Sequence, residues 1–196
     1  MPRFISENSI EFYRDLITKA FEAGIRNFVM SHLSQQELIP IGCRVLSNEN
    51  VYVFNDAAAK CLQEFGAHSF IYPQEIDFET LYSLSNKSGI VPVYFYPELF
   101  YSRMPVRLPD GEELTDSMNL RLRRFRQNGL TSVVPNIPVS VSQSKNKLQA
   151  QGFYRFLIDL SFEPVSKNRI KTIKSRVVKS EQIQPSTTFN YNKGLQ

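Results

Sequence analysis

Polar side chains capable of acid–base chemistry follow several segments whose composition predicts β-strands. Glu75 carries a carboxylate that can accept or donate a proton in catalysis, and His32 carries an imidazole that can do the same. Because the carboxyl ends of parallel strands meet at one edge of a sheet, we expect these side chains to face a common mouth. Each also has a structural interpretation, since such residues often cap helices or lie in ordinary loops. Glu75 is the first choice among the five candidates, which are His32, Asn55, Glu75, Glu98 and Asp159.

The best-known catalytic motifs are missing from the sequence. It contains no phosphate-binding P-loop, no dinucleotide-binding fingerprint, no nucleophile elbow and no His-Glu-x-x-His zinc motif. Two cysteines cannot supply the four ligands of a structural zinc or iron–sulfur site, so we predict no metal and no cofactor. Cys61 falls within an amphipathic helical pattern and is expected in the core. A nucleophilic pair of Cys43 and His32 rests only on their nearness in the chain.

Helix-like and strand-like segments alternate along the chain, and several helices are expected to end at a glycine. Asn55 is the predicted N-cap of a helix over residues 56–65, and Asp77 that of a helix over residues 78–85. This alternation predicts βα units around a mostly parallel sheet, interrupted by a hairpin-like insertion at residues 120–125 and 130–134. Other strands are expected at residues 25–30, 44–46, 51–54, 67–72, 91–96 and 155–160, and other helices before Gly24, at 144–151 and at 168–179.

The composition is that of one soluble domain. The 196 residues are 42% hydrophobic and 21% charged, and no apolar run approaches the roughly 20 residues of a membrane-spanning helix. The N-terminus has no apolar stretch of the signal-peptide type, so we expect a cytoplasmic protein without membrane association. We predict a single α/β domain over residues 1–182 and an irregular tail over residues 183–196.

Positive charge is concentrated toward the C-terminus. Residues 165–196 hold seven Lys/Arg and one acid, a net charge of +6, whereas residues 1–164 hold 16 Lys/Arg and 18 Asp/Glu, a net charge of −2. A basic segment can contact nucleic-acid phosphates or an acidic partner, although lysines along a helix are more often a solvated face. Further arginines lie in the predicted hairpin at Arg121, Arg123, Arg124 and Arg126.

Short segments in order along nearly the whole chain share one family pattern. They are Pro-Arg-Phe-Ile at residues 2–5, Val-Tyr-Val-Phe-Asn-Asp-Ala-Ala-Ala at 51–59, Pro-Gln-Glu-Ile at 73–76, Leu-Phe-Tyr-Ser-Arg at 99–103, Phe-Leu-Ile-Asp-Leu at 156–160 and Phe-Asn-Tyr-Asn-Lys-Gly-Leu at 189–195. Together they resemble the collagenase-like peptidases of unknown catalytic type, in the C-terminal portion of a longer family member. The resemblance implies a TIM-barrel-like or partial (β/α) barrel, with mostly parallel strands and an inserted hairpin. Only about five strand–helix repeats are present, against the eight of a closed barrel.

The activity that the resemblance implies is peptide-bond hydrolysis, with a peptide or protein as substrate. The positions that match the family pattern are Asn55, Glu75, Tyr101, Arg103 and Asp159. The implied catalytic set is Glu75, Asp159 and Arg103, in which Glu75 is the general acid or base and Arg103 holds a carboxylate or an oxyanion. Asn55 and Tyr101 would orient the peptide, together with His32, which stands where relatives commonly have asparagine.

Two alternatives stay open. Other family members act in hydroxylation of RNA or of a quinone precursor with an iron–sulfur cluster on four cysteines, but residues 96–105, which align with the cysteine-bearing stretch, contain none. The chain would then be an accessory or RNA-binding domain that contacts phosphates through the basic helix and Arg121, Arg123, Arg124 and Arg126, and stacks a base on Tyr94, Tyr96, Phe100 or Tyr101. The second alternative is a domain that completes the barrel of an N-terminal partner domain or subunit.

Overall fold

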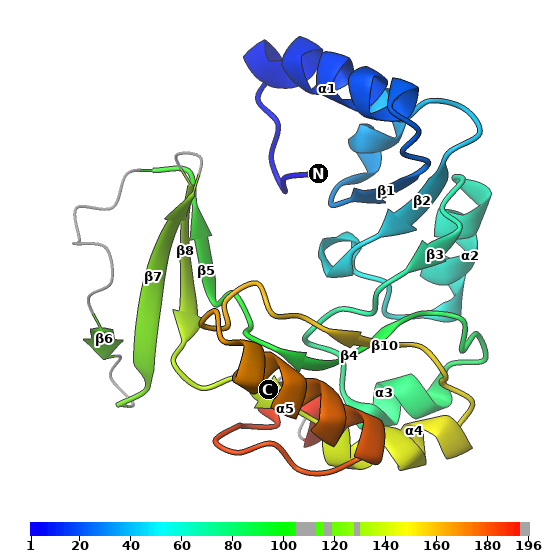
Figure 1. Cartoon of the computed structure of the whole chain (residues 1–196). Coiled ribbons are helices and arrows are strands. Elements are labelled where there is room, and N and C mark those ends of the chain that lie inside the picture. Colours follow the sequence, from blue (N-terminus) through cyan, green and yellow to red (C-terminus); the bar gives the residue numbers. More distant parts are fainter. Residues whose placement is uncertain (105–112, 116–118, 128–129, 193–196) are drawn as a thin grey trace. The chain divides into compact units, whose positions relative to one another are not determined.

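The computed structural model describes residues 1–104, 113–115, 119–127 and 130–192 (Figure 1). The chain forms two compact units. Unit 1 comprises Met1–Pro92, Leu148–Leu157 and the described residues from Asn190 onward. Unit 2 comprises the described residues of Val93–Lys147 and of Ile158–Phe189. The chain therefore leaves unit 1 and returns to it twice.

Unit 1 is built on a parallel sheet of three strands in the order β1-β2-β3 (Figure 1). Strand β1 (Asn27–Met30) pairs with β2 (Arg44–Ser47), and β2 pairs with β3 (Ser69–Phe70). Parallel neighbours need crossover connections, and η2 and α2 lie in these connections. The predicted alternation of helices and parallel strands is confirmed in this unit, but the strand expected at residues 51–54 is wrong, because the chain forms η3 there and then the cap of α2. Its helical segments are η1 (Glu7–Ser9), α1 (Ile10–Glu22), η2 (Leu33–Leu38), η3 (Glu49–Val51), α2 (Asp56–Glu64) and α3 (Phe78–Ser83), while α4 (Lys145–Ala150) and η5 (Phe189–Asn192) each cross a unit boundary.

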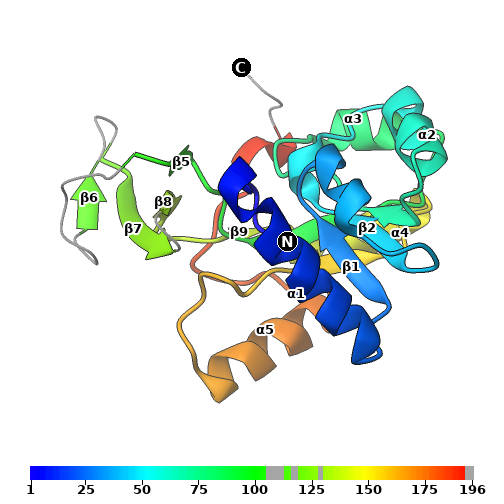
Figure 2. The same cartoon turned by 90° about the horizontal axis from the view of Figure 1, so that it is seen from above.

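The core of unit 1 lies on one face of this sheet, because successive strand residues point to opposite sides. Met30, Val45 and Phe70 fill that face and are at most 2% exposed. The Phe70 ring meets Tyr72 edge to face, with centroids 5.1 Å apart. Gly89 lies so close that a Cβ there would be 2.4 Å from the Phe70 ring, so only glycine fits. Figure 2 shows α1 running along the β1 side of the unit.

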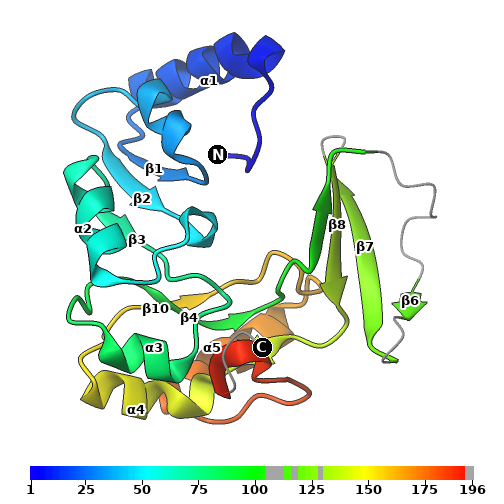
Figure 3. The same ribbon diagram turned by 180° about the vertical axis from the view of Figure 1, so that it is seen from behind.

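Unit 2 contains an antiparallel sheet and part of a mixed sheet. The mixed sheet has the order β10-β4-β9, in which β4 (Val91–Phe95) pairs antiparallel with β9 (Val139–Ser140), and β10 is Phe156–Ile158. Both β4 and β10 cross a unit boundary. The antiparallel sheet has the order β5-β8-β7-β6 (Figure 3). Its strands are β5 (Phe100–Ser102), β6 (Glu113–Thr115), β7 (Arg121–Gln127) and β8 (Leu130–Pro135), and the long helix of the unit is α5 (Lys167–Lys179). The antiparallel pairing of β7 with β8 confirms the predicted hairpin.

The predicted TIM-barrel-like or partial (β/α) barrel is wrong. The strands form three separate small sheets, none of them closed, and the chain is a mixed α/β protein. The reason lies at β4, whose neighbour β9 is antiparallel, so the series of parallel βα units stops there. The inserted strands pair with one another and add nothing to the parallel sheet.

The burial of Cys61 and the structure of the C-terminal tail also differ from the sequence-based predictions. The expected core position of Cys61 is wrong, because Ala59 and Leu62 take the buried face of α2 and Cys61 is exposed. Within the predicted irregular tail, Ile183 and Tyr191 are buried and η5 forms a turn of 3-10 helix. Residues 193–196 of that tail lie outside the described residues.

Candidate functional site

Three of the predicted residues lie in the loops that follow β1, β2 and β3. We call the edge of the sheet formed by the carboxyl ends of these strands, together with these loops, the carboxyl edge. His32 follows β1, Asn55 follows β2 and Glu75 follows β3. The parallel register of the three strands brings these loops to the same edge of the sheet. The loop after β2 also carries Tyr52, which sequence reasoning did not select.

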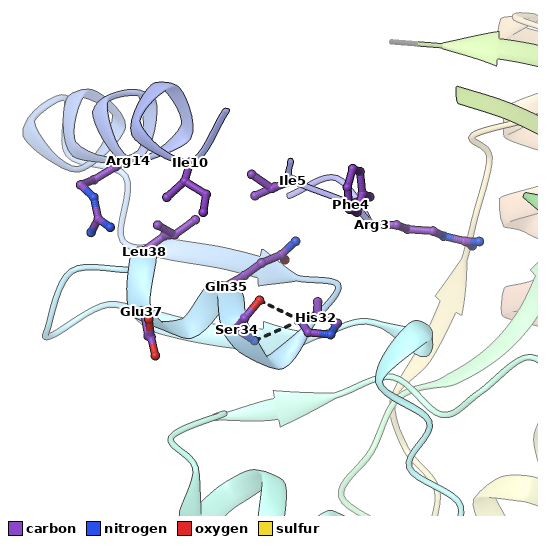
Figure 4. Close-up of a pocket in the computed structure, with 10 residues that line it drawn as sticks. All are labelled: Arg3, Phe4, Ile5, Ile10, Arg14, His32, Ser34, Gln35, Glu37 and Leu38. Atoms are coloured by element: carbon purple, nitrogen blue, oxygen red, sulfur yellow. Dashed lines mark hydrogen bonds between the residues drawn. The ribbon is translucent and has the colours of Figure 1, made fainter. Parts of the chain in front are cut away.

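A cavity of about 400 Å³ lies beside the carboxyl edge (Figure 4). Ile10 of α1 and Leu38 of η2 both line it, and the close-up shows them near one another. His32 also lines the cavity and is the N-cap of η2. Its Nδ1 accepts a hydrogen bond from the Ser34 N–H at 3.2 Å and lies 2.8 Å from Ser34 Oγ. An Nδ1 that accepts a backbone N–H is unprotonated, so the ring proton is assigned to Nε2.

One buried glutamine holds the N-terminal segment against the carboxyl edge. Gln35 accepts a hydrogen bond from the Ser31 N–H at 2.8 Å through Oε1 and donates to the Pro2 carbonyl at 2.6 Å through Nε2. The Ser31 hydroxyl donates to the Met1 carbonyl at 2.9 Å. These contacts fix the backbone next to Arg3, whose guanidinium points away from the Ile10 side of the cavity (Figure 4).

Arg3, Tyr52 and Glu75 interact electrostatically at the carboxyl edge. Partial burial raises the pKa of Tyr52, and so do the charge of the Glu75 carboxylate and the hydrogen bond between the two side chains, while the charge of Arg3 lowers it. Tyr52 has φ 53° and ψ 60°, in the left-handed region. Such a backbone costs a non-glycine residue about 1 kcal/mol and is enriched at functional sites. The edge therefore joins a carboxylate, a phenol and a guanidinium.

Asn55 and Asp77 are helix caps, as the sequence predicts. The Oδ1 of Asn55 accepts a hydrogen bond from the Ala58 N–H at 2.7 Å, and the Oδ1 of Asp77 accepts one from the Thr80 N–H at 2.7 Å. Each bond satisfies one of the N–H groups that a helix start leaves unpaired. The amide oxygen of Asn55 is thus already committed to α2.

The remaining predicted catalytic and substrate-binding residues belong to unit 2. The Oδ1 of Asp159 accepts hydrogen bonds from the Ser161 N–H at 2.8 Å and the Ser161 hydroxyl at 2.6 Å, which closes a turn after β10. Tyr101 lies on β5 opposite Ser132, and Arg103 follows β5 with an exposed side chain. The predicted set is divided between the units, with His32, Asn55 and Glu75 in unit 1 and Glu98, Tyr101, Arg103 and Asp159 in unit 2.

The hairpin arginines alternate between the two faces of β7, because strand residues point in turn to opposite sides. Arg121 and Arg126 are exposed, whereas Arg124 is only 6% exposed. The guanidinium of Arg123 lies 5.0 Å from the centroid of the Tyr96 ring, close enough for a cation–π contact. The four arginines therefore do not form one continuous exposed row.

A buried carboxylate in unit 2 is the group that sequence reasoning missed. Glu163 accepts hydrogen bonds from Tyr94 at 2.5 Å and Tyr96 at 2.9 Å through Oε2, and from Arg169 Nε at 2.8 Å through Oε1. Burial alone would raise the pKa of Glu163, but the hydrogen bonds from Tyr94, Arg169 and Tyr96 hold it below its usual range. Tyr94 and Tyr96 are at most 5% exposed, so neither ring is available to stack on a base. Tyr94 lies on β4 and Tyr96 directly follows it, and nothing in their spacing identifies Glu163 as their partner.

Unit 2 carries the positive charge of the chain. Its ranges hold 14 Lys/Arg and eight Asp/Glu, a net charge of +6, while those of unit 1 hold nine Lys/Arg and 11 Asp/Glu, a net charge of −2. Lys167, Lys171 and Lys174 follow helical spacing on α5 and are all exposed, and we call them the lysine face. Within the described ranges, none of these ammonium groups has an ion-pair partner. The apolar side of α5 is already buried through Ile173 and Val177.

Comparison with protein-family models, with curated proteins and with solved structures finds no match for this chain. In the part of the chain that the structure describes, no three His, Cys, Asp or Glu side chains are grouped as metal ligands would be. The same part contains no helix with the length and apolar character needed to cross a bilayer.

Proposed function

We propose that the carboxyl edge of unit 1 binds a peptide and that Glu75 acts as general acid and base in hydrolysis of a peptide bond. The proposal follows the resemblance to collagenase-like peptidases and includes a cytoplasmic location. The observation that carries it is the electrostatic grouping of Glu75, Tyr52 and Arg3 at the edge where parallel α/β sheets bind their substrates.

The reaction needs a proton acceptor, a proton donor and a positive group. A water molecule adds to the peptide carbonyl as Glu75 takes one of its protons, and Glu75 then returns that proton to the amide nitrogen as the C–N bond breaks. Arg3 stabilises the negative charge that develops on the carbonyl oxygen, the role that the resemblance implied for Arg103. Tyr52 positions the carboxylate through its hydrogen bond. An apolar side chain of the peptide fits the cavity lined by Ile10 and Leu38.

Cleavage of an unfolded protein substrate by the purified chain tests this proposal. Glu75→Gln removes the proton acceptor with little change in shape, so we expect at least about a hundredfold loss of rate. Arg3→Gln should also lower the rate, while Glu79→Gln, an exposed position on α3 of the same unit, should not. Absence of cleavage by the parent chain, or full activity of Glu75→Gln, would refute the proposal.

The lysine face favours a second function, binding of RNA. Like charges three and four residues apart destabilise a helix, so exposed lysines without ion-pair partners among the described residues suit a polyanionic partner. The buried apolar side of α5 argues against a membrane surface, because an interfacial helix inserts its apolar side into the lipid. Phe100 is 51% exposed on β5 and is available for base stacking.

Salt dependence of binding to a single-stranded oligoribonucleotide tests the second function. Replacement of the three lysines of the lysine face by glutamine should weaken binding and reduce the salt slope by about two, because each phosphate contact on a single strand contributes roughly 0.7. A control with the same change in charge replaces exposed lysines elsewhere, at Lys19, Lys60 and Lys147. Equal affinity of the two triple variants, or no binding at low salt, would exclude the lysine face as an RNA site.

A further inference from the structure

The face of the unit 1 sheet opposite its core is polar and open. The register places Asn27 beside Arg44, and Leu46 beside both Val29 and Ser69, so these side chains share one face. Val29 is 42% exposed, and Asn27 and Arg44 are exposed as well. Both faces of a parallel sheet are ordinarily covered by apolar contacts, so a charged and exposed face calls for a functional explanation.

A cavity of about 420 Å³ lies on this face, and we call it the cationic cavity. The side chains that line it and can bind an anion are Asn27, Arg44, His68, Ser69 and Arg155. Among the described residues, no aspartate or glutamate lines it. The other residues that line it are apolar, namely Phe28, Val29, Val45 and Leu46.

Two donors of the cationic cavity, Arg155 and His68, are held in place by hydrogen bonds within unit 1. Arg155 donates from Nη1 to the Ser69 hydroxyl at 2.6 Å and to the Ser88 carbonyl at 3.2 Å, which fixes its guanidinium. The Nδ1 of His68 accepts a hydrogen bond from the Val45 N–H at 3.2 Å, so its proton is assigned to Nε2, which can donate to a ligand. Within the described chain, Arg44 has no carboxylate partner.

We propose that the cationic cavity binds the phosphoryl group of a phosphate monoester. Two guanidinium groups match the charge of a phosphate dianion, and arginine donates to phosphate oxygens in a bidentate geometry. His68 and Asn27 add neutral donors, and the volume exceeds that of phosphate alone, which leaves room for the attached group beside Val29 and Leu46. The cationic cavity shares no lining residue with the Glu75 grouping or with the lysine face, so the proposal depends on neither function.

Calorimetric titration of the full chain with inorganic phosphate is the first test. Arg44→Gln should weaken phosphate binding about tenfold or more, as expected for loss of charge-assisted hydrogen bonds. The control Lys60→Gln removes one positive charge from the exposed surface of α2 in the same unit and should leave binding unchanged. Arg155 also holds Ser69 and Ser88 through hydrogen bonds. The phosphate affinity of Arg155→Gln is therefore compared only if its thermal unfolding matches that of the parent. Undetectable phosphate binding, or equal affinity of Arg44→Gln and Lys60→Gln, would overturn the proposal.

Two paired ligands distinguish the source of the phosphoryl group. A small monoester is represented by glycerol 3-phosphate against glycerol, and an RNA end by a 5′-phosphorylated oligoribonucleotide against its 5′-hydroxyl form. Binding that requires the phosphate and is weakened by Arg44→Gln supports the proposal in either pair. Binding that is indifferent to the phosphate in both pairs contradicts it. The triple variant of the lysine face should leave binding of glycerol 3-phosphate intact, which separates this site from the proposed RNA contact.

Discussion

Arg169 of α5 donates from Nε to the Oε1 of Glu163 across 2.8 Å, and its Nη2 donates to the Tyr94 hydroxyl at 3.3 Å. Because Tyr94 in turn donates to Glu163, the guanidinium, the carboxylate and the phenol form a closed set of hydrogen bonds. They join three parts of unit 2, namely α5, β4 and the segment after β10. The helix that carries the lysine face is therefore attached to β4 through Arg169, the buried Glu163 and Tyr94.

Replacement of Glu163 by glutamine should destabilise the chain by about 2 kcal/mol, because the hydrogen bonds from Tyr94, Tyr96 and Arg169 lose their charged acceptor. The Glu163 side chain is 4% exposed, whereas that of Arg169 is 30% exposed and keeps part of its contact with water in the variant. The measurement is the free energy of unfolding in urea at pH 7. Glu181→Gln, at an exposed position, is the matched control and should change it by less than about 0.5 kcal/mol.

The same carboxylate predicts a specific loss of stability in acid. The pKa of Glu163 is below its ordinary value of 4.5 in the folded chain, so the native state holds fewer protons there than the unfolded state. Its contribution is present above about pH 4.5 and is lost as the pH falls through the lower native pKa. The difference in unfolding free energy between the parent and Glu163→Gln should shrink as the pH is lowered from 5 to 3. A difference that stays constant over this interval would show that the pair does not titrate as described.

Tyr72 predicts a loss of stability in alkali. Burial raises the pKa of Tyr72 to about 12 from 10.0. Between these values the unfolded chain releases this proton and the native chain retains it, so stability falls as the pH rises from 10 to 12, by about 3 kcal/mol for a shift of this size. Tyr72→Phe should remove this part of the pH dependence, although it also loses the hydrogen bond to the Asn86 carbonyl and so starts from a lower stability. Tyr154→Phe, at a residue that is 70% exposed, should retain the parental slope.

Asn55 distinguishes a structural role from substrate binding. Asn55→Ala should cost about 1 kcal/mol of unfolding free energy, because α2 loses its side-chain cap, whereas Asn55→Ser should recover most of it. If the cap is the whole role, peptide cleavage at a temperature well below unfolding should be unchanged in both variants. A cleavage rate reduced tenfold in Asn55→Ser, with stability preserved, would restore the substrate-binding role that the resemblance implies.

Local structure could be predicted from the sequence because its causes are local. The caps at Asn55 and Asp77 are made to N–H groups three residues later, and the helix predicted over residues 56–65 is found as α2 at Asp56–Glu64. The parallel pairing of β2 with β1 and with β3 also follows from the alternation of elements. These features required no knowledge of distant contacts.

The sheet boundaries and the buried ion pair could not be predicted in the same way. The antiparallel pairing of β4 with β9 consists of two residue pairs, Tyr94 with Ser140 and Phe95 with Val139. A strand as short as β9 has no periodic hydrophobic pattern that could predict this pairing. Glu163 lies outside any predicted element, and its tyrosine partners are on a strand far away in the sequence. Arg3 belongs to the segment at residues 2–5 that resembles the family pattern. Its interaction with Tyr52 involves a backbone that Gln35 holds through the Pro2 carbonyl, and no sequence motif predicts this hydrogen bond.

The hydrogen bonds of Gln35 join two different parts of the chain at the carboxyl edge, namely the loops of the sheet and the N-terminal segment. Tyr52 and Glu75 come from loops of the sheet itself, whereas Arg3 comes from a segment attached by an amide side chain to the Pro2 carbonyl. The positions of Tyr52 and Glu75 therefore depend on the sheet, whereas that of Arg3 also depends on the hydrogen bond from Gln35 to the Pro2 carbonyl. Gln35→Ala should release the N-terminal segment, and Arg3 with it, while the three strands stay paired.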